Sequence, residues 1–435
     1  MPRVRSAVLS LLVLLSLITL PAARADAQEN QTMSEVVGRL YLQSAIDSAS
    51  AFIGVLNPTP DEVDAIIADI ESQLRTALTM NNLIGAQVSS FPLGSSAGGF
   101  SWTFDPALGT FSRVSPSFGP VFSERALTVG RRRLNVGINY QRATFDSVAS
   151  RDLEGGDIRF YLGVQNVFPA VDFFFEDSLD LKLTSDTVGF FGTYGITDRL
   201  DVGIAIPVMS VDMEATLSSR FGTNEGVDDD DPTIYSARES ASGIGDIVLR
   251  AKYAFLKTRG GGLAAGIDWR LPTGDEEELL GIAGAQGKFY LAASSAHGRV
   301  SPHLNVGFTV SGDTAAARSL ETFVFDPPDE WNYAGGIDVA VTDRITVVGD
   351  LIGRTLRDRD VENYDLKLEV VPSRFGSQFQ QFETRPGALN MILGSAGVKL
   401  NPFGRALLAF NVLFPLNEAG LQDNLTWVGG FEWSF

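Results

Sequence analysis

The chain has 435 residues and a formal net charge of −19. This acidity argues against a nucleic acid partner, which would require clustered lysine and arginine. Its 44 glycines and 29 phenylalanines are high numbers for an ordinary globular enzyme of this length. The absence of cysteine fits an exported protein but decides little by itself.

The N-terminus has the pattern of a secretory signal peptide. Two arginines precede an apolar run at residues 7–20, and a small-residue cleavage site follows between Ala25 and Asp26. The run is shorter than the ~20 residues of a membrane-spanning helix, so cleavage is favoured over an uncleaved anchor. Beyond it no apolar stretch reaches spanning length. Membrane insertion would therefore require a closed barrel, in which every backbone group in lipid is paired.

Two amphipathic helices are predicted after the signal peptide. Residues 59–62, Thr-Pro-Asp-Glu, read as a capping box with proline at the first helical position. Apolar residues repeat at helical spacing both behind this box, over 63–78, and before it, over 37–53. The simplest interpretation is a helical hairpin within residues 26–82 whose two apolar stripes pack against each other.

The next segment, residues 83–132, is rich in Gly, Ser and Phe and shows no dominant period. We expect either an irregular plug for a barrel or a linker with an extra hairpin. Phe100, Trp102 and Phe104 alternate briefly within it. If the cargo is hydrophobic, these three side chains are the best candidates for contacts with it; they could equally serve to pack a plug.

From residue 133 to residue 435 apolar residues recur at every second position, which is the pattern of half-buried strands. Short turns alternate strictly with long polar connections. The connections are 146–179, 218–242, 272–286, 312–330, 357–385 and 416–424. Transmembrane barrels have this alternation of tight periplasmic turns and long external loops. The predicted fold class is therefore all-β, a transmembrane antiparallel β-barrel of about 12 strands, with 14 as the alternative, and with both termini on the periplasmic side.

The last strand ends on alternating aromatics. Phe431, Trp433 and Phe435 share a face that we expect to meet lipid, while Glu432 points into the lumen. A terminal aromatic at such a position looks like the signal read by the outer-membrane barrel assembly machinery. That machinery, outer-membrane lipid and lipopolysaccharide are therefore expected partners.

Charged residues on the opposite face of the strands are predicted to line the lumen. They are Asp201, Arg250, Lys252, Asp268, Arg270, Asp338, Asp350, Lys399 and Glu432. They could select and guide a small-molecule solute. They could also be a set of structural pairs, because neighbouring strands present opposite signs.

Two other groups suggest chemistry only weakly. The carboxylates of residues 228–231 lack the spacing and central glycine of a calcium loop, so a solvated external loop is the better interpretation and no metal or cofactor is expected. Ser301 and His303 share a strand face, but no nucleophile elbow accompanies them and His297 lies in a turn. We therefore expect no enzymatic activity.

Three stretches carry a family resemblance. Residues 193–208 ("TYGITDRLDVGIAIPV"), 339–351 ("VAVTDRITVVGDL") and 269–275 ("WRLPTGD") resemble outer-membrane proteins grouped as the phenol meta-pathway degradation family, within the long-chain fatty-acid transporter clan. The resemblance covers roughly residues 133–435. It implies a barrel that passes hydrophobic or aromatic small molecules. The helical hairpin is additional to that pattern.

Together these features predict an outer-membrane channel of a diderm bacterium for passive uptake of small hydrophobic or aromatic solutes. The alternative is a structural or surface-interaction barrel without transport, which would show a lumen fully occluded by side chains. A barrel hydrolase is a further alternative and would need His303 within reach of a serine.

Overall fold

The computed structural model describes residues 32–56, 58–89, 95, 99–105, 110–168, 171–228, 231–258, 260–282, 284–312, 327–357 and 367–435. The predicted signal peptide and its cleavage site lie outside these ranges. None of the helices in the described part of the chain is long and apolar enough to cross a membrane.

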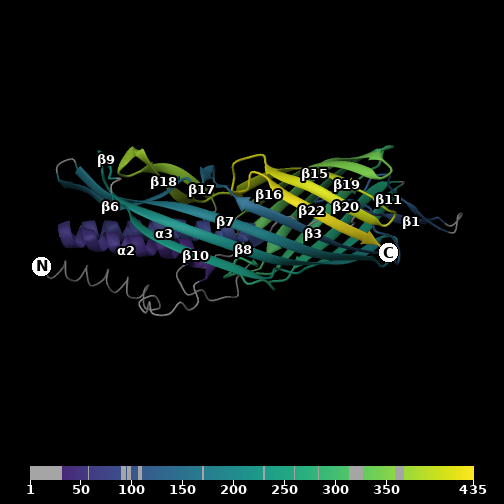
Figure 1. The fold of residues 1–435 in the computed structure, drawn as a ribbon, viewed down its shortest axis with the longest axis horizontal. Helices are drawn as coiled ribbons and strands as arrows, with labels where there is room; N and C mark the ends of the chain where they lie inside the picture. Colours follow the sequence, from purple (N-terminus) through teal and green to yellow (C-terminus); the bar gives the residue numbers. More distant parts are fainter. Residues whose placement is uncertain are drawn as a thin grey trace.

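Twelve antiparallel strands of the described residues close into a ring, which confirms the predicted fold class and the lower of the two strand numbers. In ring order they are β3 (Leu134–Phe145), β7 (Val171–Gly195), β8 (Leu200–Thr223), β11 (Val248–Thr258), β12 (Gly261–Arg270), β13 (Gln286–Ser294), β14 (Val300–Ser311), β15 (Asp329–Thr342), β16 (Ile345–Arg357), β19 (Leu389–Leu400), β20 (Ala406–Pro415) and β22 (Thr426–Ser434). β22 pairs with β3, so the first and last strands of the ring are joined (Figure 1).

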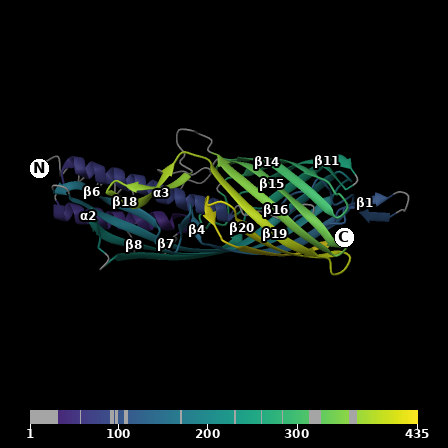
Figure 2. The same cartoon turned by 90° about the horizontal axis from the view of Figure 1, so that it is seen from above.

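The predicted alternation of short and long connections is present. Short turns link β7 to β8, β11 to β12, β13 to β14, β15 to β16 and β19 to β20, at the end of the barrel where the C-terminus lies (Figure 1). The long connections lie at the other end (Figure 2). They carry the short strands β4 (Ser147–Val148), β5 (Arg151–Asp152), β6 (Ile158–Phe168), β9 (Gly226–Val227), β10 (Thr233–Ile244), β17 (Lys367–Ser373), β18 (Gly376–Arg385) and β21 (Leu421–Gln422).

Two strands of the ring continue far beyond it. β7 and β8 have 25 and 24 residues, whereas a strand needs about 9–11 to cross a membrane. They stay paired along their whole length, and β6 and β10 add to their outer halves as edge strands. These four strands form a sheet that we call the extension. The predicted polar connections at 146–179 and 218–242 are thus wrong in their bounds, since both contain long stretches of strand.

The reason for that error is an inversion of polarity along each strand. On β8 the outward side chains are apolar up to Val208 and then become polar, beginning with Ser210, Asp212 and Glu214. The inward face changes in the opposite sense, from Asp201 to apolar residues such as Val211. Outward apolar side chains suit lipid and outward polar ones suit water. The inversion therefore marks the level at which the barrel leaves the membrane.

Helices α2 (Val36–Leu56) and α3 (Pro60–Ser89) follow a short 3₁₀ turn, η1 (Met33–Glu35). The predicted capping box is confirmed: the Thr59 N–H donates to Oε2 of Glu62 at 2.6 Å, and the Glu62 N–H points back to Thr59 Oγ1 at 3.4 Å. α3 begins at Pro60, as expected, but extends beyond the predicted boundary at residue 82.

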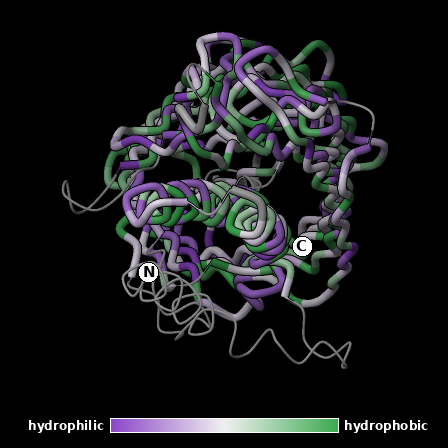
Figure 3. The backbone as a smooth tube through the Cα atoms, turned by 90° about the vertical axis from the view of Figure 1, so that its left-hand side faces the viewer, coloured by the Kyte–Doolittle hydropathy of each residue, from purple (hydrophilic) through white to green (hydrophobic). Residues whose placement is uncertain are grey.

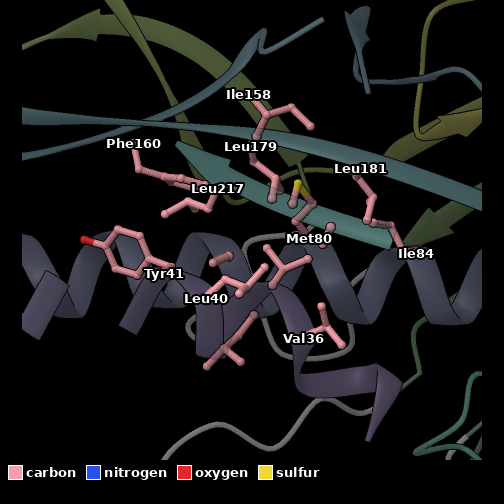
Figure 4. Packing of buried hydrophobic residues seen from close by; sticks show 14 of the residues in the cluster. Val36, Leu40, Tyr41, Met80, Ile84, Ile158, Phe160, Leu179, Leu181 and Leu217 are labelled. Atoms are coloured by element: carbon pink, nitrogen blue, oxygen red, sulfur yellow. The ribbon is translucent and has the colours of Figure 1, made fainter. Parts of the chain in front are cut away.

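Both helices pack on the apolar inner face of the extension as well as on each other (Figure 4). Tyr41 of α2 meets Phe160 of β6 with ring centroids 5.3 Å apart, and Met80 of α3 lies beside Leu181 of β7. Burying these side chains removes from water the face that the polarity inversion turns inward. The extension and the helical hairpin therefore stabilise each other.

Polar contacts fix the helices at two further points of this assembly. Asp177 of β7 accepts a hydrogen bond from Ser44 Oγ of α2 at 2.9 Å, and burial raises the pKa of this carboxyl to about 6. Arg374, in the β17–β18 turn, pairs with Asp69 of α3 at 2.7 Å, and burial raises the pKa of that carboxyl also to about 6. The β17–β18 hairpin thereby closes over α3.

The helices lie at the long-connection end, opposite Phe435 (Figures 1 and 2), and in the view from that end they lie within the outline of the barrel (Figure 3). The Ser34 N–H donates to the carbonyl of Glu277, in the connection between β12 and β13. The first described residues thus lie at the end opposite Phe435. Residues 1–31 lie outside the described ranges, so the location of both chain ends on the periplasmic side stays a prediction.

The polarity inversion predicts that substitution by arginine lowers the free energy of unfolding much more at one level of the outward face of β8 than at another. Ile204→Arg places a charge in the lipid belt and should cost roughly 2–4 kcal/mol of unfolding free energy. Thr216→Arg, on the same outward face but beyond Ser210, should change it by less than about 0.5 kcal/mol. Urea unfolding in lipid vesicles, followed by tryptophan fluorescence, measures both. Equal costs for the two variants would contradict the assigned boundary.

Candidate functional site: the barrel interior and its plug

The barrel interior is occupied by the chain itself. Beyond α3, β1 (Trp102–Asp105) and β2 (Thr110–Arg113) form a hairpin at the short-turn end, beside the C-terminus (Figures 1 and 2). The described residues after this hairpin lie inside the ring, and the Arg132 N–H donates to the carbonyl of Gly195 just before β3. We call the described residues between 95 and 131 the plug segment. Of the two predicted alternatives for this region, an irregular plug and an extra hairpin, the structure contains both.

Inward charges from all around the ring hold the plug segment by its backbone. Lys399 donates from Nζ to the carbonyl of Pro120 at 2.7 Å, and Glu432 accepts from the Gly99 N–H at 2.6 Å. Asp201 accepts from the Val129 N–H at 2.9 Å. Each buried charge thus has a polar partner on the plug, which offsets part of the cost of its burial.

A second group of charges surrounds Glu124 of the plug. Lys252 Nζ lies 2.9 Å from Oε2 of Glu124, and a guanidinium nitrogen of Arg250 lies 3.9 Å from Oε1. Arg250 also pairs with Asp268 of the neighbouring strand at 3.6 Å. Arg270 donates to the carbonyl of Ser89 at the end of α3, at 3.0 Å.

The two remaining predicted lumen residues, Asp338 and Asp350, flank His303. Nδ1 of the histidine lies 3.3 Å from Asp338, and Nε2 lies 2.5 Å from Asp350. Asp350 also accepts from Ser123 of the plug at 3.1 Å. The structure thus brings all nine predicted charged residues to the interior face, eight of them around the plug segment and Arg270 at its entrance beside α3.

The serine and histidine that a barrel hydrolase would use are not paired. Ser301 Oγ lies 3.1 Å from Ser117 Oγ of the plug, while both ring nitrogens of His303 face carboxylates. His297 does contact a serine, Ser295, at 3.1 Å, but on an exposed turn. Within the described residues, neither serine and histidine pair forms the hydrogen-bonded chain of nucleophile, base and orienting acid that a hydrolase requires.

Arg125 is an interior residue that the sequence analysis missed. Its side chain is fully buried in the plug segment, near the charges of Asp338 and Glu432. The guanidinium lies against Gly119, where a Cβ atom would come within 2.4 Å of Cζ and where φ is +70°. The positive φ favours glycine at residue 119, and a Cβ there would also require the guanidinium to shift. The signal available in the sequence was the adjacent pair of charges at 124 and 125 within a Gly, Ser and Phe-rich segment.

The predicted aromatic contacts lie at the short-turn end. Phe100 is buried between Trp102, stacked at 6.0 Å, and Phe118, edge-on at 5.5 Å. Trp102 donates from Nε1 to Ser434 Oγ at 3.2 Å, next to the C-terminus. The side chain of Phe104 lies outside the described residues. Here the aromatics pack the base of the plug against β20 and β22.

A cavity of about 150 Å³ remains between the plug and the long-connection end. Its walls come from β11 to β16, and Phe122 and Glu124 of the plug form part of its lining. A second, more apolar cavity of about 80 Å³ near β19 and β20 shares Ile352 and Arg354 with it. The lumen is thus filled at the short-turn end and partly open above it.

Part of the acidic run at 228–231 lies outside the described residues. In the part of the chain that the structure describes, no group of three or more His, Cys, Asp or Glu side chains is placed to hold a metal ion.

Comparison with known proteins places the barrel in a family. The sequence model of the family described as "Putative MetA-pathway of phenol degradation" matches residues 127–362, from the end of the plug to β16. The chain belongs to this family. No curated protein matches the chain.

Solved structures that match the chain include an outer membrane channel from Pseudomonas putida F1, 15% identical, with a TM-score of 0.44 over 70% of this chain and 96% of that one. A FadL homologue from Pseudomonas aeruginosa is 10% identical, with a TM-score of 0.32 over 79% and 96%. The Ralstonia pickettii toluene transporter TbuX is 11% identical, with a TM-score of 0.26 over 80% and 99%.

If the plug is held by its backbone, removing one buried anchor should loosen it. Lys399→Ala leaves the carbonyls of Phe118 and Pro120 buried without a charged donor, which should cost about 1–3 kcal/mol locally. Hydrogen exchange of the amides between 117 and 126 should accelerate roughly tenfold or more. Lys257→Ala, which removes an exposed bond to the carbonyl of Asp198, is the matched control and should leave these amides unchanged. Unchanged exchange in Lys399→Ala would show that this contact does not hold the plug.

Proposed function

We propose that this protein is a channel of the bacterial outer membrane that lets small solutes pass down their concentration gradient. The observation that supports this most is the nature of the plug contacts. The plug segment meets the wall largely through single hydrogen bonds and ion pairs, such as those of Asp201, Asp350 and Lys399. Such contacts can exchange for contacts with water when the segment shifts, whereas a tightly packed apolar core cannot separate without a cavity cost.

In this proposal the nine inward charges have two roles. They anchor the plug in the closed state and line a polar path when the segment moves. The proposed cargo is a small hydrophobic or aromatic molecule. Support comes from the family description, which refers to phenol degradation, and from the rings of Phe122 and Tyr290 in the wall of the larger cavity.

The orientation follows from the lengths of the connections. The short-turn end, with Phe435, would face the periplasm, and the helices with the extension would face the cell exterior. Outward aromatics at the short-turn end, including Trp433 within 6.4 Å of Phe435, form a girdle suited to the lipid interface. Lipid, lipopolysaccharide and the barrel assembly machinery are the proposed partners, and the signal peptide supplies export to the periplasm.

One observation favours the alternative of a surface-interaction barrel. The extension, the two helices and the β17–β18 hairpin build a folded body beyond the lipid belt, larger than a channel needs. This body could bind a partner at the cell surface. It does not replace transport, since a lumen filled largely through polar contacts, with a cavity of about 150 Å³, differs from one fully occluded by packed side chains.

Locking the plug to the wall tests the channel directly. Ser117 and Ser301 have hydroxyl oxygens 3.1 Å apart, and the chain contains no cysteine, so the double variant S117C/S301C can form a single defined disulfide. Oxidised protein in liposomes should take up a small aromatic solute at least ~10-fold more slowly than reduced protein, because a fixed plug cannot shift.

The single variant S117C is the control for the substitution itself and should take up the solute at the same rate with and without reductant. If the oxidised double variant transports as fast as the reduced one, the path does not involve movement of this segment. If neither form nor the wild type transports any solute, the channel proposal fails and the surface-interaction alternative gains.

A further inference from the structure

The larger cavity is lined by an unusual excess of positive charge for this protein. Its charged lining consists of four cations, Arg250, Arg270, Lys288 and Arg354, and three carboxylates, Glu124, Asp268 and Glu330. The whole chain has a formal net charge of −19. The lining of this cavity therefore carries more cations than carboxylates, although the chain as a whole is strongly acidic.

The carboxylates are already committed to two of the arginines. Glu330 pairs with Arg354 through both oxygens, at 2.5 and 3.1 Å. Asp268 pairs with Arg250 at 3.6 Å, and Glu124 lies within reach of Arg250 and Lys252. The acids of the cavity are therefore satisfied by neighbours on the wall.

Arg270 and Lys288 are different. Arg270 donates to the carbonyl of Ser89, and Lys288 lies 5.9 Å from the ring of Tyr290. Within the described residues neither has a carboxylate at ion-pair distance. Lys288 lies opposite Asp268 in the strand register, and Asp246 is the carboxylate whose charge most favours Arg270, but neither is a direct ion pair. A buried cation without a direct ion pair is costly, so an anion in the cavity would be stabilised by both.

The two cations can reach one anion. Arg270 of β12 pairs in register with Gln286 of β13, and Lys288 follows two residues along the same face. Residues in this diagonal relation have Cα atoms about 7–8 Å apart, a distance that long side chains span. Both side chains line the cavity, so a guanidinium and an ammonium can contact the same carboxylate there.

Aromatic rings also line this cavity, and one of them belongs to the same strand face as Lys288. The ring of Tyr290 lies over Gly266, where a Cβ atom would come within 2.3 Å of Cζ, so the glycine makes room for it. Phe122 of the plug also contributes to the lining. A volume of about 150 Å³ is comparable to that of an engineered cavity that holds one benzene molecule.

We propose that this cavity binds a small aromatic carboxylate, with the carboxylate group on Arg270 and Lys288 and the ring beside Tyr290 and Phe122. The proposal deepens the proposed function and rests on it, because it names the class of solute that the channel would hold before the plug moves. A neutral hydrocarbon would leave both cations unpaired.

Benzoate and benzyl alcohol are the probes, since they share a ring and differ in charge. Isothermal titration calorimetry on the full chain in detergent should show benzoate binding at least ~10-fold more tightly than benzyl alcohol. Lys288→Met should weaken benzoate at least ~10-fold and leave benzyl alcohol unchanged. Lys288→Arg should retain most of the affinity, which separates charge from general damage to the fold.

Lys182→Met, on the water-exposed outer face of β7, is the matched control and should bind benzoate like the wild type. Equal affinity of the wild type for the two probes, or unchanged benzoate binding in Lys288→Met, would overturn the carboxylate site. The two proposals can fail separately. If uptake depends on the redox state of the S117C/S301C variant but benzoate is not preferred, the channel proposal stands and the carboxylate site is wrong. If benzoate binding depends on charge but no solute is taken up, the carboxylate site stands and the channel proposal is wrong.

Discussion

Closure of the ring is the constraint on which the rest of the structure depends. Within the lipid core no water is present to satisfy backbone N–H and C=O groups, so a sheet there must have no free edge. Pairing of β22 with β3 meets this requirement. Once the ring is closed, every second side chain must face lipid and the others must face an interior. The apolar outer belt and the polar lumen follow from this alternation rather than from separate causes.

The end of the lipid belt explains the extension and the two helices that cover its inner face. Beyond it the outer face of β7 and β8 meets water, so polar side chains move outward and the apolar ones move inward. An apolar inner face without lipid or a second layer would be unstable, and α2 and α3 cover it. Because the helices precede the ring in the chain yet lie at the end opposite Phe435, the ring must close around the plug segment that joins them to β3.

The sequence allowed the barrel, its strand number and the start of α3 at Pro60 to be predicted, because period-two alternation, turn lengths and a capping box are local signals. It did not reveal the extension. A strand whose apolar face changes sides, as between Val208 and Val211, interrupts the expected pattern and resembles a polar loop. The nine inward charges could be predicted because strand parity places them. The partners of Arg125 and His303 could not be predicted, since Arg125 lies in the plug near Asp338 and Glu432, and His303 lies between Asp338 and Asp350 of two other strands.

The most direct test of this account is the side of the membrane on which the helices lie. Ser72→Cys, exposed on α3, and Asp343→Cys, in the turn between β15 and β16, give single thiols at the two ends of a chain that has none of its own. Intact cells are treated with a polyethylene glycol maleimide too large to cross the outer membrane. The account predicts labelling of the cysteine at residue 72 in intact cells and of the one at 343 only after lysis. Labelling of both positions in intact cells would contradict the threaded barrel, and labelling of position 343 but not 72 would contradict its orientation in the membrane.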